Sequence, residues 1–268
     1  MNVAPTTAAE TAAPAEAAAP AESAAPAEAA AHAATAGRRT TLKAGEAYAW
    51  LRDQIVQGEL MPNERLVELD LTASLGLGRA AVRTFLARLE QEGLVVREPN
   101  RGARVRMVSE AEALEITQAR AALEALTVRE AAVHATYDEI AILRETLAFM
   151  ADRIQAGDLL AYSEGNARLH AKIIAISGHR TAARLIQGLK AQVVRFQYRT
   201  VLVPGRSMQS LAEHTAIVDA IATHDSEAAE AAMRRHLSHV ASTLRETASA
   251  RAQHQRPETD KWPDVPAD

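Results

Sequence analysis

The sequence contains no cysteine. This absence excludes a disulfide framework, cysteine-ligated zinc, iron–sulfur clusters and a thiol nucleophile, and it fits a reducing compartment such as the cytoplasm. Aromatic residues make up only 3% of the 268 residues while alanine is abundant, which favours helices over strands. No apolar run approaches the roughly 18 residues that a membrane-spanning helix needs. We therefore expect a mainly helical cytoplasmic protein of one or two domains, with no membrane partner.

Strong charge of either sign is also missing, since the net charge is -4. The charge is unevenly distributed along the chain. Residues 1–37 have no Lys or Arg and carry -4, residues 38–108 have 12 basic and 9 acidic side chains, and residues 109–268 have 18 and 21. The middle segment is thus the only basic one, but its excess is too small to establish a nucleic-acid partner by itself.

The two ends of the chain differ in composition from the rest. Residues 1–39 are rich in Ala, Pro and Glu and have almost no large apolar side chains, so we expect a disordered tail. Residues 252–268 are polar and contain several prolines, and we expect a second tail there. Two folded domains are expected between the tails, over residues 40–108 and 109–251.

Residues 40–108 show three short helical patterns followed by two short strands. In the third pattern, Val82, Leu86 and Leu89 form an apolar stripe, and Arg79 and Arg83 share a face beside it. This order is typical of a winged helix-turn-helix domain. The helices are expected at about 47–56, 67–75 and 78–91, and the strands at 94–97 and 103–108, around a turn at 99–102.

The physical chemistry of this arrangement suits DNA. The N-terminal residues of a recognition helix reach base edges in the major groove, where an arginine can pair bidentately with guanine. A basic wing tip can contact phosphates or enter the minor groove. The alternative for Arg79 and Arg83 is a plain solvated helix face.

The same segment has a longer series of characteristic positions: Leu51-Arg52, Ile55, Gly58, Leu60, Pro62, Leu66, Glu68, Leu75-Gly76-Leu77-Gly78-Arg79, Val82-Arg83, Leu89, Glu92-Gly93-Leu94-Val95, Pro99-Asn100-Arg101-Gly102-Ala103 and Val105. In this series it resembles the DNA-binding domain of the GntR family. The resemblance covers about 60 residues and implies DNA contacts by Arg79, Arg83, Arg101 and Gly102.

This chain departs from the family pattern in its turn and recognition helix. Gly78 stands where the family usually has Ser or Thr, and Ala80-Ala81 stands where it has Thr-Pro or Thr-Thr. The missing hydroxyls remove hydrogen bonds to phosphates or bases. The operator sequence is therefore not transferable from relatives.

Residues 109–251 contain no convincing strand, and six helical patterns are separated by short turns. We expect an all-α antiparallel six-helix bundle. The helices are expected at about 109–135, 137–157, 159–177, 181–203, 207–223 and 225–251.

Four polar residues lie in or beside the apolar stripes that such a bundle buries. Asn166 and His170 are four residues apart on the third helix, His214 lies on the fifth and His236 on the sixth. At 1.5 Å per residue, the last two stand about 15–17 Å from the turn that joins their helices, and so are level with each other. Together the four side chains can converge on one divalent transition metal, whereas each histidine alone is more simply a satisfied core residue.

The bundle segment resembles the FCD ligand-binding domain, in its VanR-like branch. The resemblance implies metal binding by Asn166, His170, His214 and His236, with Zn first and Ni, Co, Fe or Mn as alternatives. It also implies that Arg120 faces an effector pocket and pairs there with a carboxylate. Asn166 stands where Asp is commoner, so we expect weaker metal binding or greater reliance on an anionic effector. Arg199 is a second candidate for the pocket.

These features predict a transcription regulator controlled by an effector and no enzyme. A homodimer would bind a palindromic operator, and a small organic acid bound near the metal would release it, since the resemblance favours repression. One alternative is a metalloenzyme using the three-histidine site, which lacks a convincing general base. The other is a nonspecific DNA-binding protein, which would require a strong basic excess.

Overall fold

The computed structural model describes residues 43–98 and 102–254 of the chain. The tail expected at 1–39, the wing residue Arg101 and residues 255–268 of the expected C-terminal tail lie outside the described residues. Among the described helices, none combines the length and apolar character that crossing a membrane requires.

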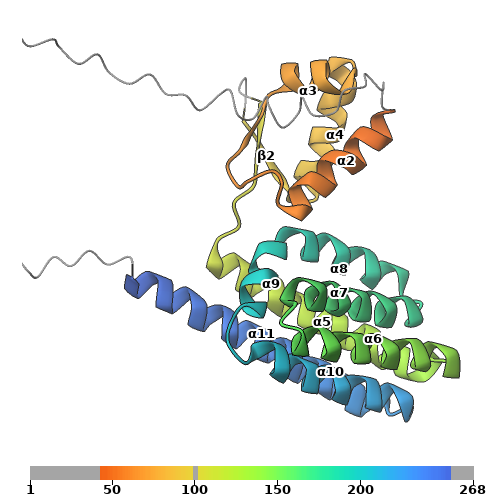
Figure 1. Cartoon of the computed structure of the whole chain (residues 1–268). Helices are drawn as coiled ribbons and strands as arrows, with labels where there is room; N and C mark the ends of the chain where they lie inside the picture. The colour runs from red at the N-terminus through yellow and green to blue at the C-terminus, as the bar shows by residue number, and fades with distance from the viewer. Residues whose placement is uncertain (1–42, 99–101, 255–268) are drawn as a thin grey trace, which may run out of the picture. The chain divides into compact units, whose positions relative to one another are not determined.

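The first described part is a small α/β unit of helices and an antiparallel sheet (Figure 1). Its elements match the predicted winged helix-turn-helix order. They are α2 (Ala44–Gln57), β1 (Arg65–Leu66), α3 (Glu68–Leu75), α4 (Arg79–Gln91), β2 (Val95–Glu98) and β3 (Gly102–Val105).

The core of this unit forms where α2 and α4 pack together. Leu51 and Ile55 of α2 and Val82, Leu86 and Leu89 of α4 are all buried. Each large aliphatic side chain that is fully buried contributes about 1.5–3 kcal/mol. The predicted inward stripe of α4 is confirmed, and Arg79 and Arg83 are exposed beside it.

The sheet has the order β1-β3-β2, with β3 antiparallel to both neighbours. The two-residue strand β1 was not predicted, because an alternating pattern needs more residues to be visible. It pairs Leu66 with Ala103. Beside this pair, Gly102 has φ +84°, and a Cβ atom there would lie 2.8 Å from the carbonyl oxygen of Leu66. Only glycine fits this position without strain.

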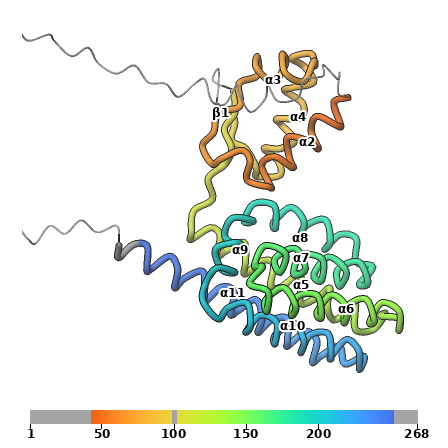
Figure 2. The backbone as a smooth tube through the Cα atoms, in the orientation of Figure 1, coloured from red at the N-terminus to blue at the C-terminus, as the bar shows by residue number. Residues whose placement is uncertain are grey.

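The second described part consists of helices throughout, as predicted (Figure 2). α5 packs along α11 and also contacts α7 and α8, and α6 packs on α7 and α10. The helices are α5 (Glu110–His134), α6 (Tyr137–Gln155), α7 (Leu159–Ile176), α8 (Arg180–Gln192), α9 (Val194–Val201), α10 (Arg206–Ala222) and α11 (Ser226–His254).

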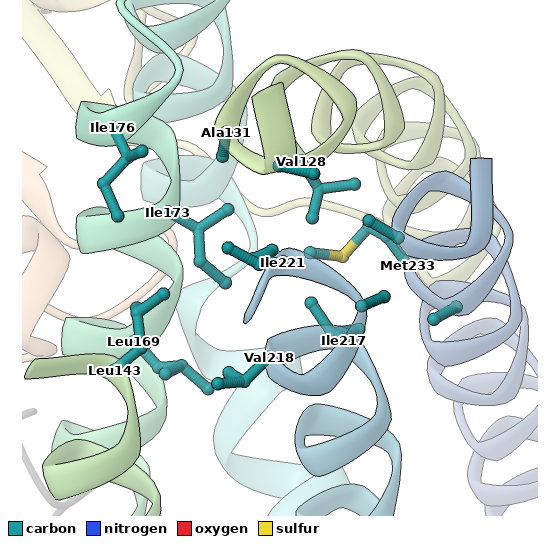
Figure 3. Packing of buried hydrophobic residues seen from close by; sticks show 14 of the residues in the cluster. Val128, Ala131, Leu143, Leu169, Ile173, Ile176, Ile217, Val218, Ile221 and Met233 are labelled. Atoms are coloured by element: carbon teal, nitrogen blue, oxygen red, sulfur yellow. The ribbon is translucent and has the colours of Figure 1, made fainter. Parts of the chain in front are cut away.

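The bundle core is mostly aliphatic, and its side chains come from five helices. Figure 3 shows part of this core. Leu143, Leu169, Ile217 and Ile221 are completely buried, and Met233 of α11 fills the space beside them. The residues at helical spacing in the sequence are the ones that pack here, which explains why the helix positions could be predicted.

One predicted helix is divided in two. The segment expected as a single helix over 181–203 breaks at Val193, whose φ of -116° and ψ of 14° are not helical. No proline or glycine marks the break, so the pattern did not reveal it. As a result, α9 is a separate short helix, and its Thr200 and Val201 line the cavity described below.

Candidate metal centre and nucleic-acid interface

Three histidines from three helices meet inside the bundle. His170 of α7, His214 of α10 and His236 of α11 are all buried, and their candidate ligand nitrogens lie within 4.8 Å of one another. The Nε2 atoms of His170 and His214 are 3.0 Å apart, and the rings of His214 and His236 have centroids 4.3 Å apart. Two nitrogens on one tetrahedral zinc ion lie roughly 3.3 Å apart. The rings thus have nearly the spacing that one cation requires.

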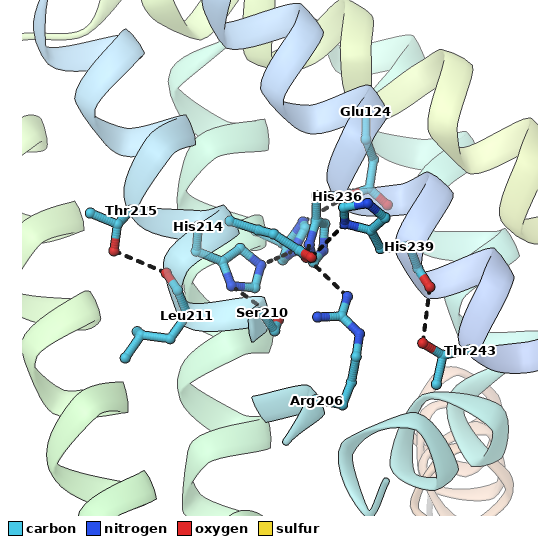
Figure 4. A network of polar contacts seen from close by, with 11 residues as sticks. Glu124, Arg206, Ser210, Leu211, His214, Thr215, His236, His239 and Thr243 are labelled. Atoms are coloured by element: carbon cyan, nitrogen blue, oxygen red, sulfur yellow. Dashed lines mark hydrogen bonds and ion pairs between the residues drawn. The ribbon is translucent and has the colours of Figure 1, made fainter. Parts of the chain in front are cut away.

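A carboxylate holds the outer nitrogen of two of these rings (Figure 4). Nδ1 of His170 lies 2.7 Å from Glu124 Oε2, and Nδ1 of His236 lies 2.7 Å from Glu213 Oε2. An ionised carboxylate only accepts hydrogen bonds, so Nδ1 carries the proton and Nε2 keeps its lone pair for the cluster. Nδ1 of His214 lies 3.4 Å from the hydroxyl of Ser210.

The histidines are held in the neutral form that binds metals. Burial lowers the pKa of His170 to about 4, against the opposing effect of Glu124. Burial, and then the neighbouring His236, hold the pKa of His214 well below its usual value, and burial also lowers the pKa of His236. A metal therefore meets little competition from protons at neutral pH.

Each of the two carboxylates is in turn paired with a buried arginine. Nε and Nη2 of Arg120 lie 2.9 and 2.6 Å from Glu124 Oε1, and Nη2 of Arg206 lies 3.0 Å from Glu213 Oε2. Burial alone would raise the pKa of Glu124, but the charge of Arg120 outweighs it and holds that pKa well below the usual range. The pKa of Glu213 is also lowered: burial would raise it, but hydrogen bonds to His236 and His239, and then the charge of Arg206, outweigh this effect.

A cavity of about 50 Å³ adjoins the histidines. Its lining includes Asn166 and His170 of α7, His236 of α11, and the basic residues Arg120, Lys190 and Arg206. The side-chain oxygen of Asn166 and Nη1 of Arg206 are both buried without a hydrogen-bond partner. Buried polar atoms are rarely left unpaired, so a ligand in the cavity would satisfy groups that the protein itself leaves without a partner.

The residues present fit a metal. Asn166, predicted as the fourth ligand, lines the same cavity as His170 and His236, and its oxygen is free to accept a cation. Three imidazole nitrogens with one amide oxygen form a set that suits zinc and its neighbours in the transition series. Among the described residues, no other group of three or more His, Asp or Glu side chains meets at metal-binding distance.

The two predicted effector residues occupy different places. Arg120 lines the cavity but directs two nitrogens at Glu124. Arg199 of α9 is absent from the described lining of that cavity, and its Nη2 lies 3.1 Å from Glu110 Oε1. The structure thus places only Arg120 beside the histidines.

The predicted DNA-contacting arginines are exposed on the recognition helix. Arg79 is the first residue of α4, and Arg83 follows one turn later. The side chain of Arg83 is 64% exposed, and its Nε lies 3.0 Å from Glu68 Oε2 of α3. Gly78 provides no side chain to cap the helix. Both arginine side chains are thus exposed near the N-terminal end of α4.

Sequence reasoning gave no role to Glu124, Glu213 or Arg206. For Glu124 the sequence offered one clue to a contact. It lies four residues after Arg120 on one helix, and side chains at this spacing are neighbours. Glu213 stands next to His214 in the sequence, yet it serves His236 of another helix. Only the packing of α10 on α11 brings these two together.

A winged helix-turn-helix unit followed in the chain by an all-α ligand domain defines a class of DNA-binding regulator. Comparison with protein families agrees. The model of bacterial regulatory proteins of the gntR family matches residues 43–105, and the FCD domain model matches residues 115–239. Together they account for more than half of the chain, which belongs to the GntR-family transcription regulators with an FCD domain.

Individual relatives are distant in sequence, but the match with this chain covers most of their length. The chain is 27% identical to the HTH-type transcriptional repressor RspR of Escherichia coli, over 75% of this chain and 88% of that protein. It is 28% identical to the repressor GlaR of the same organism, over 74% and 93%. The solved structure of E. coli McbR/YncC has the same fold, with a TM-score of 0.64 and 20% identity over 76% of this chain and 98% of that one.

Proposed function

We propose that this regulator is a metal-containing repressor, released from its operator by a small carboxylate. The observation that carries the proposal is the group of buried, neutral histidines His170, His214 and His236, two of them oriented by carboxylates, beside a cavity with unpaired polar atoms. Repression is supported by the relatives, since RspR and GlaR are named repressors. The protein acts in the cytoplasm as a homodimer.

The metal is held by the three histidines and Asn166. Zinc fits these ligands best, and Ni, Co, Fe and Mn are alternatives. When bound, the ion supplies a Lewis-acidic position for an oxygen of the effector. The neutral amide of Asn166 leaves more positive charge at the site than an aspartate would, so the site favours an anionic ligand.

DNA is read by the winged unit. Arg79 and Arg83 contact bases in the major groove, and the wing with Arg101 and Gly102 contacts the backbone. In a homodimer the two recognition helices would meet the two halves of a palindromic site. The effector changes this binding only if it prefers one of two arrangements of the readers.

Operator release tests the proposal directly. Genomic fragments selected by the purified protein are titrated in a fluorescence anisotropy assay, with excess random DNA, using zinc-loaded and chelator-treated protein. We expect specific binding that a small carboxylate from a screen of organic acids weakens only in the zinc-loaded protein. Equal displacement by random DNA would support the nonspecific alternative, and acid-insensitive binding would contradict the proposed effector mechanism.

A further inference from the structure

Three basic side chains line the cavity beside the histidines: Arg120, Lys190 and Arg206. An anionic ligand would use the one whose charge and hydrogen bonds are available. Arg120 directs Nε and Nη2 at Glu124 and thereby holds the carboxylate that orients His170. Burial lowers the pKa of Lys190, and the charge of Glu124 acts against this. Arg120 and Lys190 thus both lie near the carboxylate of Glu124, whereas Arg206 pairs with Glu213.

Arg206 differs from both. It is the first residue of α10, is only 6% exposed, and uses Nη2 to bind Glu213 at 3.0 Å. Its Nη1 is buried without a hydrogen-bond partner, and Arg206 is one of the residues that line the cavity. A charged N–H group that is buried and unpaired requires an acceptor, and a carboxylate oxygen is the strongest one available to it.

A second donor lies in the same cavity. The hydroxyl of Tyr162 is buried, with Ser210 beside it, and makes no hydrogen bond of normal geometry. Burial raises the pKa of Tyr162, so the hydroxyl keeps its proton and can donate. The cavity of about 50 Å³ has room for roughly four water molecules. The part of the ligand that enters it must therefore be compact.

The same arginine is linked to a histidine of the cluster. Glu213 Oε2 accepts from Arg206 and lies 2.7 Å from Nδ1 of His236 (Figure 4). Its other oxygen lies 2.7 Å from Nδ1 of His239. An anion that takes up part of the charge of Arg206 leaves Glu213 a stronger acceptor, which makes His236 a more basic ligand.

The geometry points to Arg206 as the anchor of the effector's carboxylate and as the link, through Glu213, between effector binding and metal affinity at His236. This inference rests on the proposed function and deepens it, since it assigns the ligand a compact carboxylate head. Arg206, not Arg120, carries the binding. Because binding free energies are reciprocal, the acid and the metal each tighten the binding of the other.

The test uses the full chain with Co²⁺ as metal and acetate as the minimal carboxylate, and acetamide as its neutral counterpart. Co²⁺ affinity is measured by absorption, with and without each small molecule, and acetate affinity is measured by calorimetry. In the wild type, acetate tightens Co²⁺ binding at least fivefold, within the usual range of such coupling, and acetamide does not.

Two variants of Arg206 and one control complete the design. Arg206→Gln still binds Co²⁺, but its acetate affinity falls at least tenfold and the coupling disappears. Arg206→Lys keeps a positive charge beside Glu213 but lacks the second guanidinium nitrogen that would reach the acid, so it also loses acetate affinity. This variant covers the case that Arg206→Gln does not fold. Arg129→Gln, which removes an arginine paired with Glu230 on the surface, behaves as the wild type.

The outcomes separate this inference from the function on which it rests. Wild-type acetate affinity in folded Arg206→Gln or Arg206→Lys protein would overturn the anchor. A wild type that binds Co²⁺ but no acetate would overturn it as well, while the metal centre stands. A wild type that binds acetate through Arg206 but takes up no Co²⁺ would overturn the metal centre and the coupling, and would leave the anchor supported.

Discussion

Side chains at the centre of the bundle interact in groups of three, in which an arginine binds a carboxylate and the carboxylate binds a histidine. Arg120, Glu124 and His170 form one such group. The first two side chains are 4% and 1% exposed. Burying a pair of charges this deeply is costly, so the pair is better explained by a role in orienting the histidine than by a gain in stability.

Replacing Glu124 by glutamine tests this orientation. The amide N–H₂ would donate to Nδ1 of His170 and drive the proton to Nε2, which faces the cluster. We expect metal affinity, measured by competition with a chelating dye, to fall about 10–100-fold. Glu130→Gln is the control, since Glu130 pairs with the exposed His134 on the same helix. Unchanged metal affinity in folded Glu124→Gln protein would refute the orienting role.

Acid should destabilise the metal-free protein through His170. The folded pKa of about 4 lies below the unfolded value of about 6.5, so between these pH values only the unfolded chain takes up the proton. Stability is therefore full above pH 6.5 and falls as the pH drops towards 4. From urea denaturation at pH 7.5 and 5.5, we expect a loss of at least about 1 kcal/mol. His170→Asn should reduce this loss, and an identical loss in the variant would argue against it.

The site was only partly predictable at this scale. His170, His214 and His236 stood out because polar side chains interrupted apolar stripes at matching distances from a turn, and the structure brings them together. Glu124 and Glu213 could not be assigned in the same way. Glutamates are common on helix surfaces, and whether one turns inward depends on how neighbouring helices pack.

At the scale of helices and strands, most of the fold could be predicted from the spacing of apolar residues and from the residues that form turns. The recognition helix was expected at 78–91 and is found at Arg79–Gln91. Two features were missed for physical reasons. Strand β1 is too short to show alternation, and the break at Val193 is a backbone adjustment with no sequence breaker.

Gly102 is the element-scale position where substitution should cost most. Alanine there would hold φ at +84° and place its Cβ 2.8 Å from the carbonyl oxygen of Leu66. We expect Gly102→Ala to destabilise the winged unit by about 1–3 kcal/mol, measured by thermal unfolding. Gly45→Ala is the matched control, because its Cβ meets nothing within 4 Å and alanine favours a helix. Equal stability of the two variants would show that the wing tolerates a side chain at 102.

For the whole molecule, sequence-specific DNA binding should depend on the exposed arginines of α4. Truncating Arg83 to alanine would remove the guanidinium that we propose to read a base, a contact worth about 1–3 kcal/mol. We therefore expect operator affinity to fall about 5–150-fold while binding to random DNA changes little. Arg129→Ala, on the surface of the bundle, should bind as the wild type does. An equal loss on operator and random DNA would mean that Arg83 contacts only phosphates.

The account as a whole requires that the bundle of this regulator contains a metal. The most direct measurement is the metal content of the purified full chain by mass spectrometry, beside the His214→Ala and Asn166→Ala variants. We predict about one transition metal per chain, lost in His214→Ala and weakened in Asn166→Ala, with all three proteins folded. A wild type that is metal-free after purification and remains so after incubation with Zn²⁺ would contradict the account and leave the histidines as polar groups of the cavity.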